Sequence, residues 1–195
     1  MAGVYHSPMT TLVPVELPKA YRLLNHGPTV MVSSADKGAM NVMSAAWSMP
    51  LDFDPPKVAV VIDKNTLTRA LIEGSGEFVL NVPSSDQAAL TVAVGSTSGR
   101  DADKFAAHGI RTLPASVVKA PLVDGCLAWL ECRVIPEPHI QATYDLFLAE
   151  VVAAWADPAV FADGHWKDDQ GGRRSIHYIA GGQFFETGAA VGIKT

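Results

Sequence analysis

The sequence lacks most of the short patterns that mark a common catalytic or nucleotide site. It has no GxGxxG after an apolar run and no GxxxxGK[ST], which disfavours a Rossmann fold and a P-loop. Its 6 histidines form no HxH or HExxH spacing, so no metal site is predicted. No serine lies in a GxSxG elbow, and no paired carboxylates are visible, so hydrolysis has no support. No catalytic residue is therefore predicted.

Basic clusters and long apolar runs are also missing. Lys and Arg number 15 against 20 Asp and Glu, a net charge of −5, with no basic block. This argues against nucleic acid and against a polybasic membrane anchor, because both need clustered cations. No apolar run reaches about 18 residues, and no basic segment precedes an apolar run at the start. We therefore expect no membrane partner and a cytoplasmic location.

Cysteine is scarce, with Cys126 and Cys132 as its two examples. If residues 126–135 form a strand, both thiols face one side, roughly 20 Å apart, which is too far for a disulfide. The CxxC spacing of redox and metal sites is absent. Two buried free thiols are expected.

The length of 195 residues and the absence of repeats or linkers predict a single domain over 1–195, with an irregular N-terminal arm at 1–18. Alternating or β-branched runs predict strands at 29–34, 41–47, 57–62, 77–82, 126–135, 142–155 and 175–179. Capping residues and apolar stripes predict helices at 66–73, from 85 or 86 to about 94, and at 101–108. Because βα alternation is irregular, a mainly β fold with short helices, an antiparallel barrel, fits better than a doubly wound sheet.

The stretch from Asn41 to Ser48 (NVMSAAWS) is rich in small residues. As a strand it places Met43, Ala45 and Trp47 on one face, an acceptable pattern for a core strand. Small side chains also leave the backbone open to a flat ring. Trp47 fits either a core anchor or a wall beside such a ring.

Two other segments suit an anion. Residues 63–68 (DKNTLT) join a strand to a helix, where free N–H groups, Lys64 and the Thr66 and Thr68 hydroxyls could hold a phosphate; a simple capped turn is the alternative. Residues 98–105 (SGRDADKF) place Arg100 and Lys104 four apart after a Ser-Gly loop. Each could instead pair with a neighbouring Asp on a solvated helix face.

These segments, with 77–83 (EFVLNVP) and 121–126 (PLVDGC), resemble in order the landmarks of the flavin reductase-like, flavoredoxin-type proteins over about residues 20–185. The resemblance implies an FMN-binding split β-barrel, a homodimer with FMN at the subunit interface, and electron transfer between small-molecule donors and acceptors. NAD(P)H is the donor in the enzyme version. A flavin-binding electron carrier without a nicotinamide site and, more weakly, a pyridoxamine-phosphate-oxidase-like enzyme are alternatives.

The same resemblance adds His177, because the family often has His or Tyr before a glycine near its end, close to the flavin; a hydrogen-bonded strand histidine is the alternative. Many NADH:flavin reductases carry a histidine where this chain has Leu146, which disfavours direct NAD(P)H use. The predicted cofactor-binding residues are Asn41, Val42, Met43, Ser44, Ala45, Ala46, Trp47, Ser48, Asp63, Lys64, Asn65, Thr66, Thr68, Ser98, Gly99, Arg100, Lys104 and His177.

Overall fold

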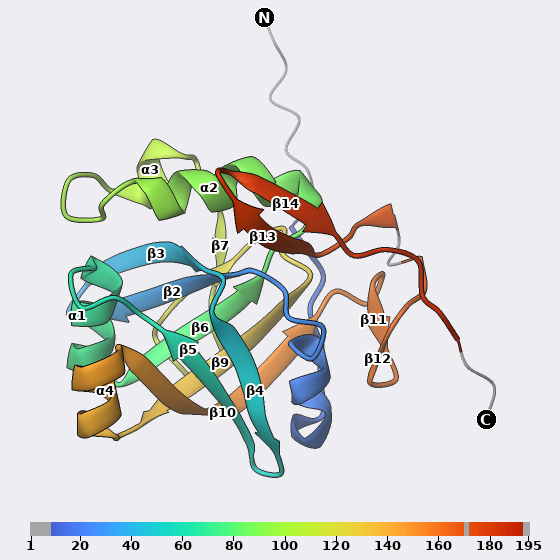
Figure 1. The fold of residues 1–195 in the computed structure, drawn as a ribbon, viewed down its shortest axis with the longest axis horizontal. Helices are drawn as coiled ribbons and strands as arrows, with labels where there is room; N and C mark the ends of the chain where they lie inside the picture. The colour runs from blue at the N-terminus through green and yellow to red at the C-terminus, as the bar shows by residue number, and fades with distance from the viewer. Residues whose placement is uncertain (1–8, 170–171, 193–195) are drawn as a thin grey trace, which may run out of the picture.

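The fold is built on one curled antiparallel sheet, seen in a computed structural model that describes residues 9–169 and 172–192. Eight strands form the sheet, in the order β3-β2-β6-β9-β10-β5-β4, with β1 added beside β10. The curl is visible in Figure 1. These strands are β1 (Val13–Pro14), β2 (Val30–Asp36), β3 (Ala39–Ala45), β4 (Ser48–Phe53), β5 (Pro56–Val61), β6 (Glu77–Val82), β9 (Ala128–Ile135) and β10 (Leu146–Ala156).

Three further strand pairs lie outside this sheet, and short helices cover it. The pairs are β7 (Thr112–Leu113) with β8 (Leu122–Val123), β11 (Phe161–Ala162) with β12 (His165–Trp166), and β13 (Ile176–Ala180) with β14 (Gln183–Glu186). The helices are η1 (Leu17–Leu23), α1 (Leu67–Ser75), η2 (Ser85–Gln87), α2 (Ala88–Ser96), α3 (Lys104–Ala107) and α4 (Pro138–Tyr144). None of the helices in the described ranges has the length and apolar character that a membrane crossing needs.

Both faces of the central strands are buried. On β6, Phe78, Leu80 and Val82 point into the barrel core, whereas Val79 belongs to a second apolar cluster on the opposite face. Strand β9 alternates in the same way, with Leu130 inside the barrel and Trp129 outside. Because successive side chains of a strand face opposite sides, the outer cluster needs a cover. Val94 of α2 and Phe105 of α3 supply part of that cover.

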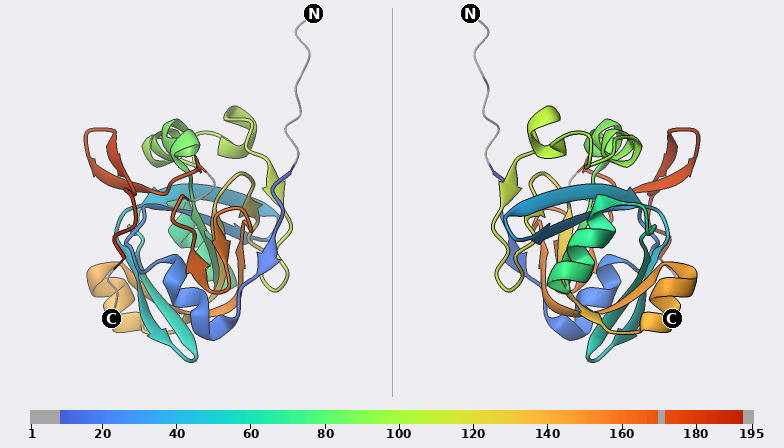
Figure 2. Two further views of the ribbon diagram at one scale, coloured as in Figure 1. Left: turned by 90° about the vertical axis from the view of Figure 1, so that its right-hand side faces the viewer. Right: turned by 90° about the vertical axis from the view of Figure 1, so that its left-hand side faces the viewer.

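The cover also places the functional elements. Figure 1 shows α2, α3 and the β13–β14 hairpin together above β3, and Figure 2 shows the hairpin projecting from the body of the molecule beside α2. Contacts between α2 and β3, and between α3 and β3, hold this layer on the sheet. The edge strand β3 thus lies beneath elements that come from distant parts of the sequence.

The expected mainly β split barrel with short helices is confirmed, and so are the two buried free thiols, whose pKa values burial raises. Some boundaries were wrong. The expected strand at 142–155 begins only at Leu146, because Pro138 starts a helix that ends at Asp145 with a φ of 55°. The expected helix at 101–108 is one turn, Lys104–Ala107.

One other expectation needs correction. The expected strand at 41–47 ends at Ala45, and Trp47 lies in the bend before β4 with 75% of its side chain exposed, so it is no core anchor. The expected N-terminal arm at 1–18 lies partly outside the described residues. In its described part, Val13 and Pro14 pair with β10 and Leu17 begins a 3-10 helix, while residues 9–12 and 15–16 have no regular secondary structure.

Candidate functional site

Three adjoining hollows follow the segment from Asn41 to Leu51. The first, here the lysine hollow, measures about 270 Å³ and the second, the hairpin hollow, about 290 Å³. They share Ser44, Gly95 and Ser96. The third, the apolar hollow, measures about 310 Å³ and meets the hairpin hollow at Ala46. A drug-sized ligand usually occupies about 300–1,000 Å³, so such a ligand would extend over more than one of them.

The lysine hollow lies between β3, the start of α1 and the loop after α2. Lys104 carries the one charge among its described lining residues, and only 4% of this residue is exposed. Its Nζ donates to Val42 O at 2.9 Å and to Val94 O at 2.6 Å, which leaves one of three N–H donors for a ligand. Burial lowers the Lys104 pKa to about 8, so the ammonium form still predominates at pH 7. The lining is Asn41, Met43, Ser44, Asn65, Thr66, Leu67, Val94, Gly95, Ser96, Thr97, Ser98, Gly99 and Lys104.

The start of α1 adds backbone donors to this hollow. Thr66 is the N-cap, and its Oγ1 accepts from Arg69 N at 3.1 Å. The Asp63 carboxylate turns back on the same loop and accepts from Asn65 N at 2.7 Å. Asn65, Thr66 and Leu67 therefore face the hollow, with the helix's first-turn amides and positive dipole end beside them. An anion is the ligand chemistry that this end favours.

Two glycines allow the close approach that shapes the hollow. A Cβ on Gly95 would lie 2.1 Å from Ser44 Oγ, and one on Gly99 would lie 2.3–2.9 Å from the amide atoms of Asn41. Asn41 is itself fixed, because its Nδ2 donates to the buried Thr68 hydroxyl at 2.9 Å. The loop after α2 can therefore lie against β3 only while position 99 lacks a side chain.

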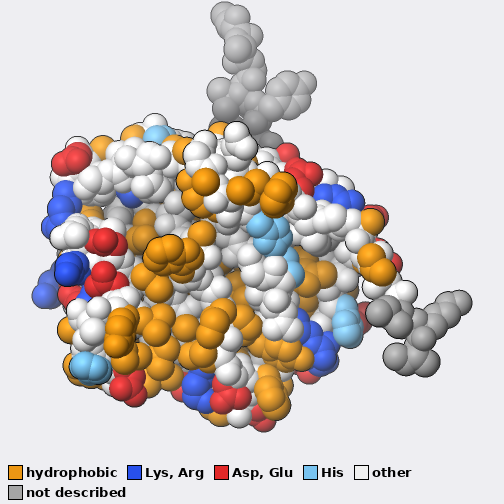
Figure 3. Space-filling view, in the orientation of Figure 1, with side chains coloured by type: hydrophobic (Ala, Val, Ile, Leu, Met, Phe, Trp, Pro, Cys, Tyr) orange, Lys and Arg blue, Asp and Glu red, His pale blue; other side chains and the backbone are white. Residues whose placement is uncertain are grey.

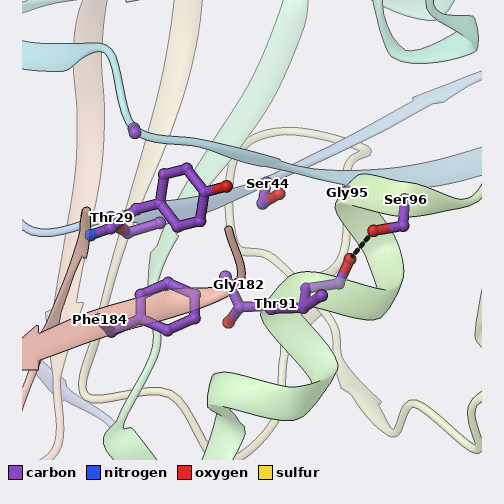
Figure 4. A pocket seen from close by; sticks show the side chains of 10 residues that line it. Thr29, Ser44, Thr91, Gly95, Ser96, Gly182 and Phe184 are labelled. Atoms are coloured by element: carbon purple, nitrogen blue, oxygen red, sulfur yellow. Dashed lines mark hydrogen bonds between the residues drawn. The ribbon is translucent and has the colours of Figure 1, made fainter. Parts of the chain in front are cut away.

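The hairpin hollow is bounded by α2 on one side and the β13–β14 hairpin on the other (Figure 4). None of its described lining residues is charged: they are Thr29, Ser44, Ala46, Thr91, Val92, Gly95, Ser96, Tyr178, Gly182 and Phe184. The Ser96 hydroxyl donates to Val92 O at 2.8 Å, and the Thr91 hydroxyl donates to Gln87 O at 2.9 Å. The oxygens of these two side chains remain free to accept from a ligand.

The apolar hollow is lined almost wholly by hydrocarbon. Figure 3 shows hydrophobic side chains gathered on this face over β4 and β5. Within it, Ser48 Oγ is buried and has no hydrogen-bond partner among the described residues. A buried hydroxyl without a partner costs free energy, which marks Ser48 as a contact for a polar atom of a ligand. The lining is Ala46, Trp47, Ser48, Met49, Leu51, Ala59, Val61, Leu146 and Leu148.

Most of the predicted site residues meet along these hollows. Those that line them are Asn41, Met43, Ser44, Ala46, Trp47, Ser48, Asn65, Thr66, Ser98, Gly99 and Lys104. Thr68 lies directly behind Asn41. Val42 and Ala45 belong to the two apolar clusters instead. Asp63, Lys64, Arg100 and His177 are not among the lining residues of these hollows.

Lys104 and Arg100 were both predicted to bind the cofactor, but they lie in different surroundings. The alternative of a surface ion pair fails for Lys104, which is buried on backbone carbonyls. Arg100 is exposed, and its backbone N–H donates to Ser98 Oγ at 3.2 Å. The sequence reading missed the contribution of α2 (Thr91, Gly95 and Ser96) and of the hairpin. The small residues Gly95 and Ser96 at the expected end of that helix were the sequence feature that could have indicated its part in the site.

Fold and hollows together define a split-barrel protein with an elongated candidate ligand site, cationic at one end and apolar at the other. The chain belongs to the flavin reductase like domain family, whose model matches residues 22–172.

Among solved structures, an FMN-binding domain of a flavin reductases-like enzyme from Shewanella baltica OS155 is 51% identical, with a TM-score of 0.92, over 96% of this chain and 100% of that one. The protein YddH of Escherichia coli (strain K12) is 46% identical over 186 residues, 94% of this chain and 98% of YddH. Flavoredoxin of Desulfovibrio vulgaris (Miyazaki F) shares the fold at 22% identity, with a TM-score of 0.76 over 99% and 97% of the two chains.

A methyl group at position 99 tests the close approach of loop and strand. We expect Gly99→Ala to displace the Asn41 amide from Thr68 and to lower the free energy of unfolding in urea by about 1–3 kcal/mol. Gly188→Ala is the matched control, because no atom lies within 4 Å of a Cβ there. In an Asn41→Ala background the added cost of Gly99→Ala should shrink. Full additivity of the two changes would contradict the proposed steric conflict.

Proposed function

We propose that this protein is an FMN-binding oxidoreductase that passes electrons through bound FMN, in the manner of a flavin reductase or a flavoredoxin. The observation that carries the proposal is the order of the three hollows along one segment, from Asn41 in β3 to Leu51 in β4. A buried ammonium and a helix start lie at one end, and an apolar surface lies at the other. FMN has the same division, with a phosphate at one end of a ribityl chain and a flat ring at the other.

The residues present fit the cofactor. The third N–H of Lys104 and the amides at the start of α1 suit the phosphate. Ser44, Ala46 and Gly95 are small, so the ribityl chain between the phosphate and the ring could run along the β3 backbone at the floor of the hairpin hollow. The unpartnered hydroxyl of Ser48 suits a polar edge of the ring. Each expected group of FMN thus has a matching feature, and these features adjoin one another in space along the three hollows.

In this proposal the protein positions the cofactor and shields it from water, while FMN supplies the redox chemistry when it is bound. Lys104 would orient the phosphate end, because it is the one cation among the described lining residues of the three hollows. Trp47, Met49 and Leu148 present hydrocarbon to the other end and keep water from one face of it. No acid–base residue of the protein is required by such a function.

A flavin-binding electron carrier is the second candidate, and Leu146 favours it. Leu146 is the first residue of β10 and lines the apolar hollow. An apolar side chain cannot donate a hydrogen bond to a carboxamide or a diphosphate. Direct use of NAD(P)H is therefore expected to be weak, even though the fold is that of flavin reductases.

The phosphate assignment predicts FMN binding in the low micromolar range or tighter, at least tenfold tighter than riboflavin. A charge-assisted contact to the phosphate should contribute more than about 1.4 kcal/mol. Because the Lys104 pKa is about 8, its charge is lost above that pH while the phosphate stays dianionic. The FMN dissociation constant should rise about tenfold from pH 7 to pH 9, and that for riboflavin should not, as measured by fluorescence titration.

Lys104→Met should remove both the preference for FMN and its pH dependence. Arg100→Met is the matched control and should change FMN affinity little, because exposed charges contribute little. Circular dichroism checks that each variant is folded. Equal affinity of the unmodified protein for FMN and riboflavin would overturn the phosphate assignment without reference to any variant.

The two candidate functions differ in their response to nicotinamide nucleotides. We expect the FMN-loaded protein, kept anaerobic, to be reduced slowly by NADH or NADPH, with a KM at or above about 1 mM. The measurement is bleaching of the visible flavin band in stopped flow. A micromolar KM with turnover of tens per second would rule out the carrier and show that a group other than residue 146 binds the nucleotide.

A homodimer is also proposed, through the exposed face of β4. Strand β4 is an edge strand that pairs with β5, and Met49, Leu51 and Phe53 on its outer face are 53%, 44% and 63% exposed. Trp47 extends this apolar face. Exposed apolar edge strands are unusual in monomers and mark association surfaces. A partner there would also cover the apolar hollow.

Leu51→Lys tests the dimer. A charge in the centre of this face should convert the protein to a monomer, because an unpaired charge at a buried interface is costly. Light scattering after size-exclusion chromatography measures the mass. Val191→Lys is the control, since Val191 is 89% exposed and lies away from β4 in the sequence. A dimer that persists in Leu51→Lys would move the interface elsewhere.

A further inference from the structure

The β13–β14 hairpin is held at its base and open at its tip. It forms a two-stranded sheet of its own, separate from the eight-stranded sheet. At the base, Thr29 N donates to Ile176 O at 2.8 Å, and Ser85 N donates to Arg174 O at 2.8 Å. Beyond Tyr178 the hairpin turns at Gly181 and Gly182, both with positive φ. The tip therefore reaches over the hairpin hollow without being part of the barrel.

Two aromatic side chains on the hairpin face that hollow. Tyr178 and Phe184 are directly opposite each other in the strand register. Their ring centroids are 5.4 Å apart, with an interplanar angle of 62°. Both line the hairpin hollow, opposite Thr91 and Ser96 of α2. The neighbouring Phe185 lies on the opposite face of the hairpin, is 68% exposed and does not line the hollow. One wall of the hollow is thus an aromatic pair.

His177 fixes the strand that carries Tyr178. Its Nδ1 lies 2.9 Å from Gly27 O, and because a carbonyl only accepts, Nδ1 must carry the hydrogen. Its Nε2 lies 3.2 Å from Thr187 Oγ1 on the other arm of the hairpin. Next to it, Tyr178 N donates to Thr29 Oγ1 at 2.8 Å. His177 therefore ties both arms of the hairpin to the segment that leads into β2.

The polar groups around the hollow are hydroxyls rather than charges. Thr29 Oγ1 accepts from Tyr178 N, which leaves the Thr29 hydroxyl hydrogen to donate. The Tyr178 hydroxyl is a second donor on the same wall. A diphosphate would find no cation among the described lining residues. An uncharged ring with carbonyl oxygens would find aromatic faces and hydroxyl donors together.

We propose that the hairpin hollow is the site of the electron acceptor, that Tyr178 and Phe184 select a planar, uncharged ring bearing carbonyl groups (a quinone), and that His177 positions them. This proposal rests on the proposed function, because the acceptor must reach reduced FMN in the adjoining hollows. His177 acts through the hairpin and is a positioning residue.

The test is equilibrium binding to the oxidised, FMN-loaded protein, measured by isothermal titration calorimetry. The probes are 2-methyl-1,4-naphthoquinone and NAD⁺, neither of which can be reduced by oxidised FMN. The unmodified protein should bind the naphthoquinone and bind NAD⁺ at least tenfold more weakly. Tyr178→Leu and Phe184→Leu should each weaken naphthoquinone binding about tenfold. Phe185→Leu, the same change one position along the strand, should leave it unchanged.

FMN affinity, measured on the same variants, separates the outcomes. If Tyr178→Leu and Phe184→Leu weaken FMN and naphthoquinone equally, the aromatic pair packs on the cofactor and the proposal is wrong. It is also wrong if the unmodified protein does not bind the naphthoquinone, or binds NAD⁺ as tightly. Failure of the unmodified protein to bind FMN would instead refute the proposed function, which the FMN titration alone reveals.

The role of His177 is tested by rescue. His177→Phe keeps a ring but loses both hydrogen bonds, and should weaken naphthoquinone binding with FMN affinity unchanged. His177→Asn keeps an N–H donor for Gly27 O and should restore most of the binding. Equal loss in both variants, or none in either, would remove the positioning role from His177.

Discussion

The ammonium of Lys104 is the contact on which the arrangement of the site depends. It joins three segments that are distant in sequence: its own helix α3, the Val42 carbonyl of β3 and the Val94 carbonyl near the end of α2. The Val94 carbonyl is among the last four of α2, which have no partner inside the helix. A cation at this C-terminal end also interacts favourably with the negative end of the helix dipole. Without this contact α2 would lose a tie to the sheet, and both the lysine and hairpin hollows would lose a wall.

The same contact explains why small residues gather around it. For the lysine to reach both carbonyls, α2 and its following loop must lie close to β3. Gly95 and Gly99 permit that approach, since a Cβ at either position would meet Ser44 or Asn41. The small residues expected to leave space for a ligand thus also allow the packing that forms the hollows. Binding and fold stability are linked at these positions, so a substitution there changes both.

Local patterns predicted the elements of this protein well, and long-range contacts explain where they did not. The run at 29–34 that predicted a strand and the cap at Thr66 that predicted the start of a helix are local signals, and the structure has β2 and α1 there. The helix α4 was missed because Ala142–Tyr144 resemble the apolar strand that follows, while its stop is set by Asp145, whose carboxylate accepts from Arg69 at 3.1 Å. Strand β4 was missed because Pro50 argues against a strand, yet an edge strand tolerates it.

The candidate site shows the same division. The segment 41–48 was recognised from its small residues. Seven residues that line the hairpin hollow with it come from α2 and the hairpin, which no local spacing connects to that segment. Lys104 and Arg100 carry the same charge on one loop, and only the packing of α3 decides that one is buried and the other exposed. The sequence therefore indicated the segment that lines one side of the candidate site, whereas its facing wall, from α2 and the hairpin, became visible only in the fold.

Charge is distributed unevenly along the candidate site, and this distribution would orient a ligand with one anionic end. Among the described lining residues, a cation occurs in the lysine hollow alone, whereas the hairpin and apolar hollows have none. In a partly buried site an anion interacts more strongly with one nearby cation than it would in water. A ligand with one anionic end is therefore held in a single orientation. Its uncharged end would lie toward the apolar hollow. The hairpin hollow between the two ends carries no charge among its described lining residues, so shape and aromatic contact would decide which second molecule can approach there.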